Sequence, residues 1–487
     1  MSRVQNCFLA TLCTFLLLSA NITILTSGQT EASRKPHLSI EWIEVWPGTE
    51  NVSISLLGIS EGPDESVYMA QCRKEWVEND SSVPTLAATR FDKKGAIIWE
   101  KEILASRPWY DSPYSMRAVS CNLTGALYLV GAIGNASDAD AVVLRMEPNG
   151  SLAWEYSWGN YDRDQFFAAT IDNAGNVIAV GGARPSGAEH FTNGTLIKLS
   201  PNGELLWTYI WNENLWTYTW NESGSAYGTV FNSVVVGKTG DIYVVGRRVT
   251  EYAYTAEGLV AKFDSSGELL WNVTCKPKYG GIWSRDLSII DSAERDAGGI
   301  LVLGAIFSRV SGPSSHEFFS MAFHDNGSQE EGQIWAWTPY TEDGLAELTL
   351  SDLASFENEE FIALGSLMVN TFVSEPPYLH QNDSLALFFL DQNGQEITNE
   401  TWSQPANLRG ERIIQITPNA YYICGRVTDQ YQQTNEWFMA RFEIEWERPM
   451  GSQSVLVRLL VGSMIVISII GTILGVFVLL GRKYQRK

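Results

Sequence analysis

The fold is decided by the stretch Ala141-Val-Val-Leu-Arg-Met-Glu-Pro-Asn-Gly150-Ser-Leu-Ala-Trp154, because it recurs along the chain. Clear copies run from Leu86 to Trp99 (LAATRFDKKGAIIW), from Thr195 to Trp207 (TLIKLSPNGELLW) and from Leu259 to Trp271 (LVAKFDSSGELLW). Weaker copies lie at 318–335, 385–402 and 437–442. Each copy places a polar turn ending in glycine between two apolar runs, a pattern that predicts a β-hairpin.

A second motif precedes each copy, and its clearest example is 168–181 (AATIDNAGNVIAVG). Its last apolar strand usually runs into a glycine, whereas Gln71 holds that position in the first copy. The glycines are Gly131, Gly181, Gly246, Gly304, Gly365 and Gly425. Two hairpins make four short strands per unit, and seven such units follow one another. This organisation predicts an all-β protein, a seven-bladed β-propeller with four-stranded blades.

The ends of the chain suggest how such a ring closes. The last unit has three strands and lacks its fourth, while an orphan strand, 38–46 (LSIEWIEVW), precedes the first unit. Its Trp42 and Trp46 have the spacing of Trp154 and Trp158, which lie in a predicted fourth strand. We therefore expect residues 38–46 to complete the last blade as its outer strand and to close the ring.

Two segments carry a family resemblance. Residues 140–150 (DAVVLRMEPNG), with Leu152 and Trp154, and residues 159–181 (GNYDRDQFFAATIDNAGNVIAVG) resemble the seven-bladed β-propeller (SBBP-type) repeat family. The likeness covers 38–448 and is strongest over 118–275. The sequence is also broadly similar to the PQQ-like propeller superfamily. The resemblance implies an extracellular repeat scaffold and brings no shared catalytic residues. We expect no cofactor.

Apolar segments at both ends predict the membrane topology. Residues 1–28 are typical of a signal peptide, with a retained N-terminal anchor as the alternative. The 22 uncharged residues 459–480 lie within a predicted transmembrane helix, 455–481. Residues 29–37 would be a linker, 38–448 the ectodomain, 449–454 a short stalk and 482–487 a basic cytoplasmic tail. This arrangement predicts a single-pass protein of the plasma membrane with its propeller on the cell surface. Gly471 and Gly475 have a spacing that permits a weak homodimer.

Charge and sequons fit an exported domain. The chain carries 34 Lys+Arg against 56 Asp+Glu, a net charge of −22, which argues against nucleic-acid binding. Asn-X-Ser/Thr sequons are frequent, so we expect a glycosylated surface. The candidate acceptors are Asn51, Asn79, Asn122, Asn135, Asn149, Asn193, Asn221, Asn272, Asn326, Asn382 and Asn399.

Ligand binding is expected on one face of the propeller. Connections on one side are tight turns, whereas those on the other side are long and rich in aromatics. Residues 206–213 (LWTYIWNE) recur as 215–222 (LWTYTWNE) in one of them, either to present aromatics to a ligand or to extend the outer strand or cover the core. The candidate ligand-binding residues are Trp76, Trp109, Tyr110, Trp216, Tyr218, Trp220 and Trp283.

Signals of catalysis are weak. The five histidines show no metal-ligand spacing, and neither HExxH nor GxSxG occurs. Asp138-x-Asp140 and Asp162-x-Asp164 offer too few carboxylates to specify a calcium site, so no metal site is predicted. No catalytic residue is predicted either. The favoured function is therefore non-enzymatic: recognition or adhesion, or an envelope scaffold, with an extracellular protein or glycan as ligand. The alternative is an extracellular glycan-processing enzyme with acidic residues in the propeller funnel.

Two further residue sets have structural interpretations. Cys72, Cys121, Cys275 and Cys424 permit two disulfides with three connectivities, or buried free thiols. Charged residues recur in the predicted third strands, where they suggest ion pairs between blades or charge at exposed strand edges. The bases are Arg90, Arg145, Lys198, Lys262 and Arg441, and the acids are Asp140, Glu257, Glu317 and Glu436.

Overall fold

The computed structural model describes most of the stretch between residues 36 and 446. The described ranges are 36–46, 52–75, 84–106, 118–121, 124–135, 138–159, 163–184, 191–211, 227–250, 255–275, 277–279, 282–283, 287–307, 316–330, 333–336, 340–341, 344–356, 360–373, 378–402, 408–427 and 436–446. Within them the chain is all-β apart from the short 3₁₀ turn η1 (Pro63–Glu65).

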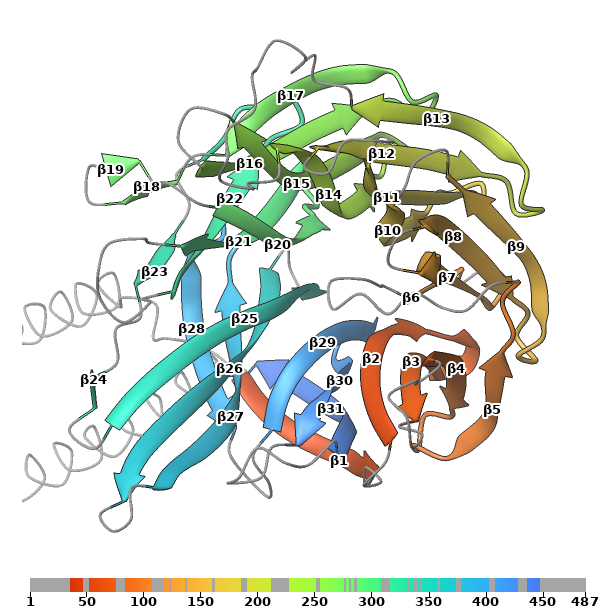
Figure 1. The fold of residues 1–487 in the computed structure, drawn as a ribbon. Helices are drawn as coiled ribbons and strands as arrows, with labels where there is room; N and C mark the ends of the chain where they lie inside the picture. Colours follow the sequence, from red (N-terminus) through yellow and green to blue (C-terminus); the bar gives the residue numbers. More distant parts are fainter. Residues whose placement is uncertain are drawn as a thin grey trace, which may run out of the picture. The chain divides into compact units, whose positions relative to one another are not determined.

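The strands follow one another in antiparallel groups (Figure 1). The first groups are β2 (Val52–Glu61), β3 (Val67–Glu75), β4 (Pro84–Phe91) and β5 (Ile97–Ile103); β6 (Ala118–Cys121), β7 (Ala126–Asn135), β8 (Asp138–Met146) and β9 (Leu152–Trp158); and β10 (Arg163–Ile171), β11 (Val177–Arg184), β12 (Phe191–Leu199) and β13 (Leu205–Trp211). Next come β14 (Tyr227–Val236), β15 (Ile242–Thr250), β16 (Thr255–Phe263) and β17 (Leu269–Cys275), then the pair β18 (Lys278–Tyr279) and β19 (Ile282–Trp283).

The later groups follow the same order. They are β20 (Leu287–Glu294), β21 (Ile300–Phe307), β22 (His316–Phe323) and β23 (Ile334–Ala336); then β24 (Tyr340–Thr341), β25 (Gly344–Phe356), β26 (Glu360–Val373), β27 (Tyr378–Leu390) and β28 (Glu396–Trp402). The last are β29 (Leu408–Thr417), β30 (Ala420–Val427) and β31 (Glu436–Trp446). Groups β6–β9, β10–β13 and β14–β17 join into one 12-stranded sheet through short parallel pairings of β8 with β10 and of β12 with β14.

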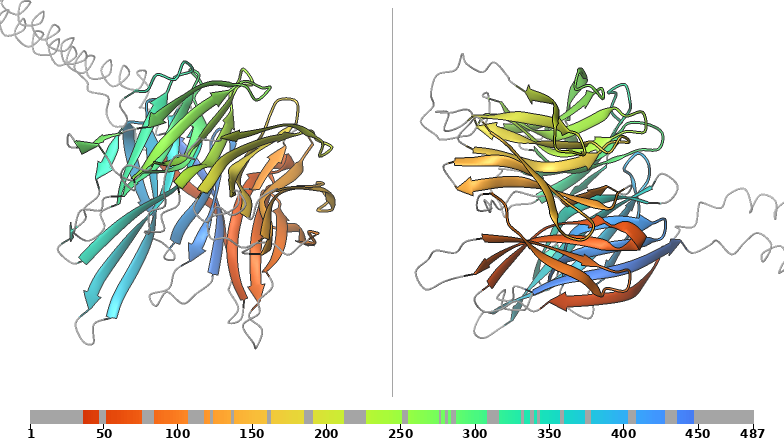
Figure 2. Two further views of the ribbon diagram at one scale, coloured as in Figure 1. Left: turned by 45° about the horizontal axis from the view of Figure 1, so that its top comes forward. Right: turned by 90° about the vertical axis from the view of Figure 1, so that its right-hand side faces the viewer.

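The N-terminal strand belongs to the sheet at the other end of the described chain. Strand β1 (Pro36–Trp46) pairs with β31, and the sheet order is β1-β31-β30-β29. Figure 2 shows β1, in red, alongside the blue β31. The expectation that 38–46 supplies the fourth strand of the last unit is confirmed, although the strand begins at Pro36.

Tryptophans in the fourth strands explain the turn glycines. Trp99 of β5 donates from Nε1 to the backbone oxygen of Pro148, 2.9 Å away in the β8–β9 turn. A Cβ on Gly150 of that turn would lie 3.0 Å from the Trp99 ring, and Gly150 has φ +82°. Both facts require glycine. The same contact joins the following groups through Trp154 with Gly203, Trp207 with Gly267, and Trp271 with Gly327.

The glycines within several second strands, including Gly181, Gly246 and Gly425, have a different cause. The first strand carries a register shift opposite this position, for example between Phe166 and Ala168. A Cβ on Gly181 would lie only 1.9 Å from the backbone oxygen of Gln165. Gly246 and Gly425 meet the first strand at 2.0 and 1.9 Å in the same way. The β-bulge therefore occupies the space that a side chain would need.

The core consists of hydrophobic clusters, each shared by two groups. Phe166 and Val143 lie in one cluster, and Val180 and Phe231 lie in the next. One cluster places Met69, of the first group, with Tyr422, of the last. Burial of these faces is the main source of stability, because no four-stranded group covers both of its faces alone.

Several predictions fall outside the described residues. These are the signal peptide 1–28, the stalk 449–454, the transmembrane helix 455–481 with Gly471 and Gly475, and the tail 482–487. In the ranges given above, no helix is long and apolar enough to cross a bilayer.

Candidate functional site

Of the aromatic residues proposed for ligand binding, the structure describes the backbone of one. Trp283 alone lies in a described strand, where its backbone pairs with that of Lys278. The others, Trp76, Trp109, Tyr110, Trp216, Tyr218 and Trp220, lie outside the described residues. The first copy of the duplicated segment forms β13, and its Tyr209 packs edge-on against Phe263 with ring centroids 4.8 Å apart. The first copy is therefore part of the sheet packing.

Described sequons are mostly exposed. Asn149 and Asn326 lie in hairpin turns, where each Oδ1 accepts a 2.7 Å hydrogen bond from the serine hydroxyl of its own sequon. Asn135, Asn149, Asn272, Asn326 and Asn399 are exposed, and Asn193 is half-buried. Glycosylation stays a prediction. The side chains of Asn51, Asn79, Asn122, Asn221 and Asn382 are outside the described set.

Buried carboxylates of the first strands bind neighbouring strands. Asp291 of β20 accepts a 2.8 Å hydrogen bond from the hydroxyl of Ser233 in β14. Asp352 of β25 accepts a 2.9 Å hydrogen bond from the backbone N–H of Ile413 in β29. Both aspartates are about 5% exposed or less. These acids therefore join adjacent groups, as buried polar side chains generally must find partners.

The basic residues of the third strands contact turns. Lys262 Nζ lies 2.8 Å from Asp241 of its own group and 2.5 Å from Asp325 of the next. Burial disfavours its charge, but the hydrogen bonds to both carboxylates outweigh burial and raise the pKa of Lys262. The hydrogen bonds from Lys262 and Tyr243 hold the pKa of Asp325 below its ordinary value. The tyrosine hydroxyl thus completes a charged junction between two groups.

Ion pairs between groups, which the sequence suggested, are present for Lys262 and Arg441, but their acids are not those of the recurring acidic column. Lys198 pairs with Asp172 at 2.9 Å and donates to the backbone oxygen of Ser265. Arg441 pairs with Glu41 and Glu65 at 2.7 and 2.9 Å. Where the structure describes the ion pairs of these bases, the acids are in turns or other strands, because the column acids lie at the far end of the third strand. Those acids are Asp140, Glu257, Glu317 and Glu436.

The described cysteines and the paired aspartates show few features of a nucleophilic or metal-binding site. Cys275 and Cys424 are free, buried thiols, and Cys72 is buried as well. Burial raises the pKa of the Cys275 thiol to about 12, which makes it a poor nucleophile. Asp140 and Asp164 both approach Gly159, but the described residues contain no group of three or more His, Cys, Asp or Glu able to hold a metal.

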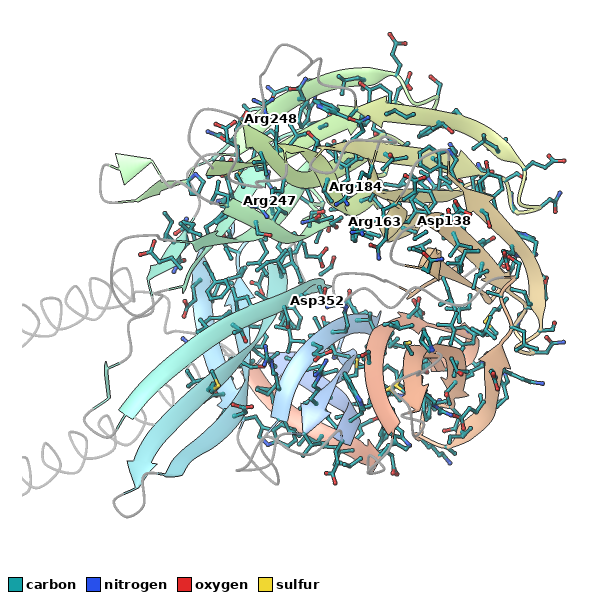
Figure 3. All side chains as sticks on the ribbon, viewed as in Figure 1. Asp138, Arg163, Arg184, Arg247, Arg248 and Asp352 are labelled. Atoms are coloured by element: carbon teal, nitrogen blue, oxygen red, sulfur yellow. The ribbon has the colours of Figure 1, made fainter. Side chains whose placement is uncertain are left out.

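Arginines gather where first and second strands end on the side of the long connections. Figure 3 shows Arg163 and Arg184 next to each other, with Arg247 and Arg248 on the neighbouring β15. Arg248 pairs with Glu257 at 3.4 Å, and Arg426, at the end of β30, pairs with Glu411 at 2.8 Å. Sequence reasoning missed this set, because the members come together only through strand register.

Searches for relatives found similarity only among solved structures. No family model and no curated protein matches the chain. A protein of unknown function from Dyadobacter fermentans has 10% identity and a TM-score of 0.45, covering 84% of this chain and 99% of its own. An ulvan lyase has 11% identity and a TM-score of 0.48, covering 80% and 93%. A PQQ-bound aldose sugar dehydrogenase from Streptomyces coelicolor has 13% identity and a TM-score of 0.32, covering 84% and 99%. In the described ranges this chain is all-β and built of antiparallel strand groups.

Proposed function

We propose that the chain forms a closed seven-bladed β-propeller of the SBBP-type repeat family. The support is a contact that repeats between groups. Trp42 of β1 donates to the backbone oxygen of Lys93 at 2.9 Å, and its ring lies 3.1 Å from where a Cβ on Gly95 would be. Trp99 has the same relationship to the β8–β9 turn. The junction between last and first groups thus uses the chemistry of an internal junction, as a closed ring requires.

The function that we propose is extracellular recognition or adhesion without catalysis, with an envelope scaffold as a related role. One observation carries it: the two ends of the strands are used differently. The tight turns are occupied by tryptophan, lysine and arginine contacts between groups. The opposite ends carry the long connections and exposed polar side chains such as Arg163, and such loops on a rigid scaffold are where ligands usually bind.

The place of this function is the cell surface. The predicted signal peptide 1–28, transmembrane helix 455–481 and sequons support an ectodomain anchored in the plasma membrane. The partner that we propose is an extracellular protein or glycan, and Gly471 and Gly475 would support a weak homodimer in the membrane.

The glycan-processing alternative is less well supported. It requires carboxylates that are free to reach a substrate in the centre of the propeller. Asp291 and Asp352, two acids of the first strands, instead accept hydrogen bonds from Ser233 and Ile413 of neighbouring groups. We therefore favour binding over turnover.

A binding screen tests the proposal. Full-length protein in detergent would be applied to an array of neutral and acidic glycans, and each bound glycan would then be incubated with the protein and analysed for cleavage. We expect capture without cleavage. Cleavage that the Asp352→Asn variant abolishes, while its melting temperature stays near that of the wild type, would establish the enzyme instead.

A further inference from the structure

Two arginines face each other across the β10–β11 pair. Arg163 and Arg184 are directly opposite in the antiparallel register, and Gln165 is opposite Gly182. Opposite residues, and residues two apart in a strand, project from the same face of a sheet. Arg163, Gln165 and Arg184 therefore share one face, and Gly182 leaves space beside the glutamine side chain.

The acids of this region lie on the other face. Asp164 is opposite Ala183, and both are fully buried against the preceding group. Val180, two residues before Gly182, packs in the cluster that contains Phe231 of β14. The face with the arginines is therefore turned toward β14 and β15. On it, the described part of the chain places neither an aspartate nor a glutamate on β10 or β11.

Two buried nitrogen atoms on this face have no hydrogen-bond partner among the described residues. Within the described part of the chain, no atom accepts a hydrogen bond from Arg184 Nε or Gln165 Nε2, although both nitrogens are buried. Thr229 shares a face of β14 with Phe231, and its buried hydroxyl also lacks a hydrogen-bond partner among the described residues. Arg163 is exposed and forms no ion pair with a described residue. A buried polar group without a partner destabilises the folded protein, and a ligand that supplies the partner removes this cost.

In a second pair of opposite arginines, other residues compensate for the repulsion between the two positive charges. Arg409 and Arg426 are also directly opposite, at the ends of β29 and β30. There, Glu411 lies 2.8 Å from Arg426, and the guanidinium stacks on Trp437 with 4.9 Å to the ring centroid. Like charges opposite each other are destabilising without such a partner. The Arg163–Arg184 pair has the same repulsion, and none of the acids that the structure describes forms an ion pair with either arginine.

We propose that Arg163, Gln165 and Arg184 bind a single oxyanion group, a carboxylate or a sulfate, of the ligand. Arginine forks hold such groups with two parallel hydrogen bonds, and the amide and the Thr229 hydroxyl add donors. One anionic group is favoured over a polyanion, because the chain's net charge of −22 repels long anionic polymers. This site rests on the recognition role proposed above and specifies the chemistry of what is recognised.

The test uses full-length protein in detergent and isothermal titration at constant ionic strength. The probes are glucuronate, inorganic sulfate and neutral glucose. We expect glucuronate and sulfate to bind and glucose not to. R163Q and R184Q should each weaken anion binding by about tenfold or more, since each removes a charge-assisted pair. R163K keeps the charge without the fork and should weaken it less. The charge-matched control for the double variant R163Q/R184Q is K94Q/K101Q, which removes two exposed lysines of the first group.

The outcomes separate this site from the wider proposal. Tighter binding of glucuronate than of sulfate would identify a sugar acid, and equal binding would identify the bare anion. Anion binding by folded R184Q at wild-type affinity, loss of binding in K94Q/K101Q, or equal binding of glucose would overturn the site. Glycan capture on the array that R163Q/R184Q retains would leave recognition standing and remove this site from it.

Discussion

The hydroxyl of Tyr422 in β30 donates a 3.1 Å hydrogen bond to the backbone oxygen of Glu65 at the end of η1, 357 residues away. Burial raises the pKa of Tyr422 to about 12, so the hydroxyl remains protonated and can donate. Arg441 pairs with Glu65 beside it. The first and last strand groups are therefore joined by specific polar contacts as well as by a shared hydrophobic cluster.

Deletion of residues 37–46 should lower the melting temperature strongly. The deletion removes β1, exposes the edge of β31 and takes away Trp42, which contacts the turn of the first group. We expect a fall of about 5 °C or more, since several kcal/mol are lost and a domain of this size shifts by roughly 1 °C per kcal/mol. Circular dichroism during heating measures it, with deletion of 29–35 as the control. An unchanged melting temperature would show that β1 does not secure the junction.

Gly203→Ala should destabilise the protein more than Gly240→Ala. Both glycines have φ near +85°, so alanine costs about 1–2 kcal/mol at either site. At Gly203 the new Cβ would also lie 2.9 Å from the Trp154 ring, whereas nothing lies within 4 Å at Gly240. We expect a further loss of roughly 1–3 kcal/mol in urea denaturation. Equal losses would mean that the tryptophan yields without cost.

The Asp172–Lys198 ion pair should make stability depend on acid pH. Burial opposes the carboxylate, but hydrogen bonds from Lys198 and Asn176 outweigh it and hold the pKa of Asp172 below 3.8. The unfolded chain therefore takes up this proton first as the pH falls. The stabilisation is complete above about pH 5 and is lost as the pH falls through 3.8 toward the folded pKa.

Asp172→Asn tests this dependence. The variant should melt below the wild type at pH 7, and the two melting temperatures should converge near pH 3. Lys198→Met should reduce the difference at pH 7, because the partner charge is then missing. If the difference in melting temperature between the wild type and Asp172→Asn stays constant from pH 7 to pH 3, the stabilisation comes from packing and not from the ion pair.

Cys275 and Cys424 should resist alkylation in the folded protein. Both thiols are buried, and burial raises the pKa of each. Iodoacetamide at pH 8 should modify them at least about 100-fold more slowly than in urea, with the sites identified by mass spectrometry. Discovery of either cysteine in a disulfide would instead support one of the connectivities that the sequence permits.

The repeat was readable because its packing residues are local in the sequence. A tryptophan and a turn glycine recur at fixed spacing, so hairpins and the missing fourth strand followed from pattern alone. The bulges were not readable. The residues skipped in the register, Phe167 and Asn232, share no chemistry, and only the glycine opposite them marks the site.

The candidate site was harder to predict for a related reason. Arg163 lies in the repeat-like segment 159–181 and Arg184 just beyond it, but nothing in that pattern pairs the two residues. Antiparallel register makes them neighbours, and register cannot be counted before the bulge at Phe167 is known. Sequence reasoning turned instead to loop aromatics such as Trp216, which lie outside the described residues.

The pairing of β1 with β31 also has a consequence for synthesis of the chain. Strand β1 ends at Trp46, but its partner begins only at Glu436. A ribosome adding about 5–20 residues per second needs roughly 20–80 s to cover that interval. During this time β1 has no edge to join. The first segment of the sheet to leave the ribosome is thus the last to find its place, and it needs protection from aggregation while it waits.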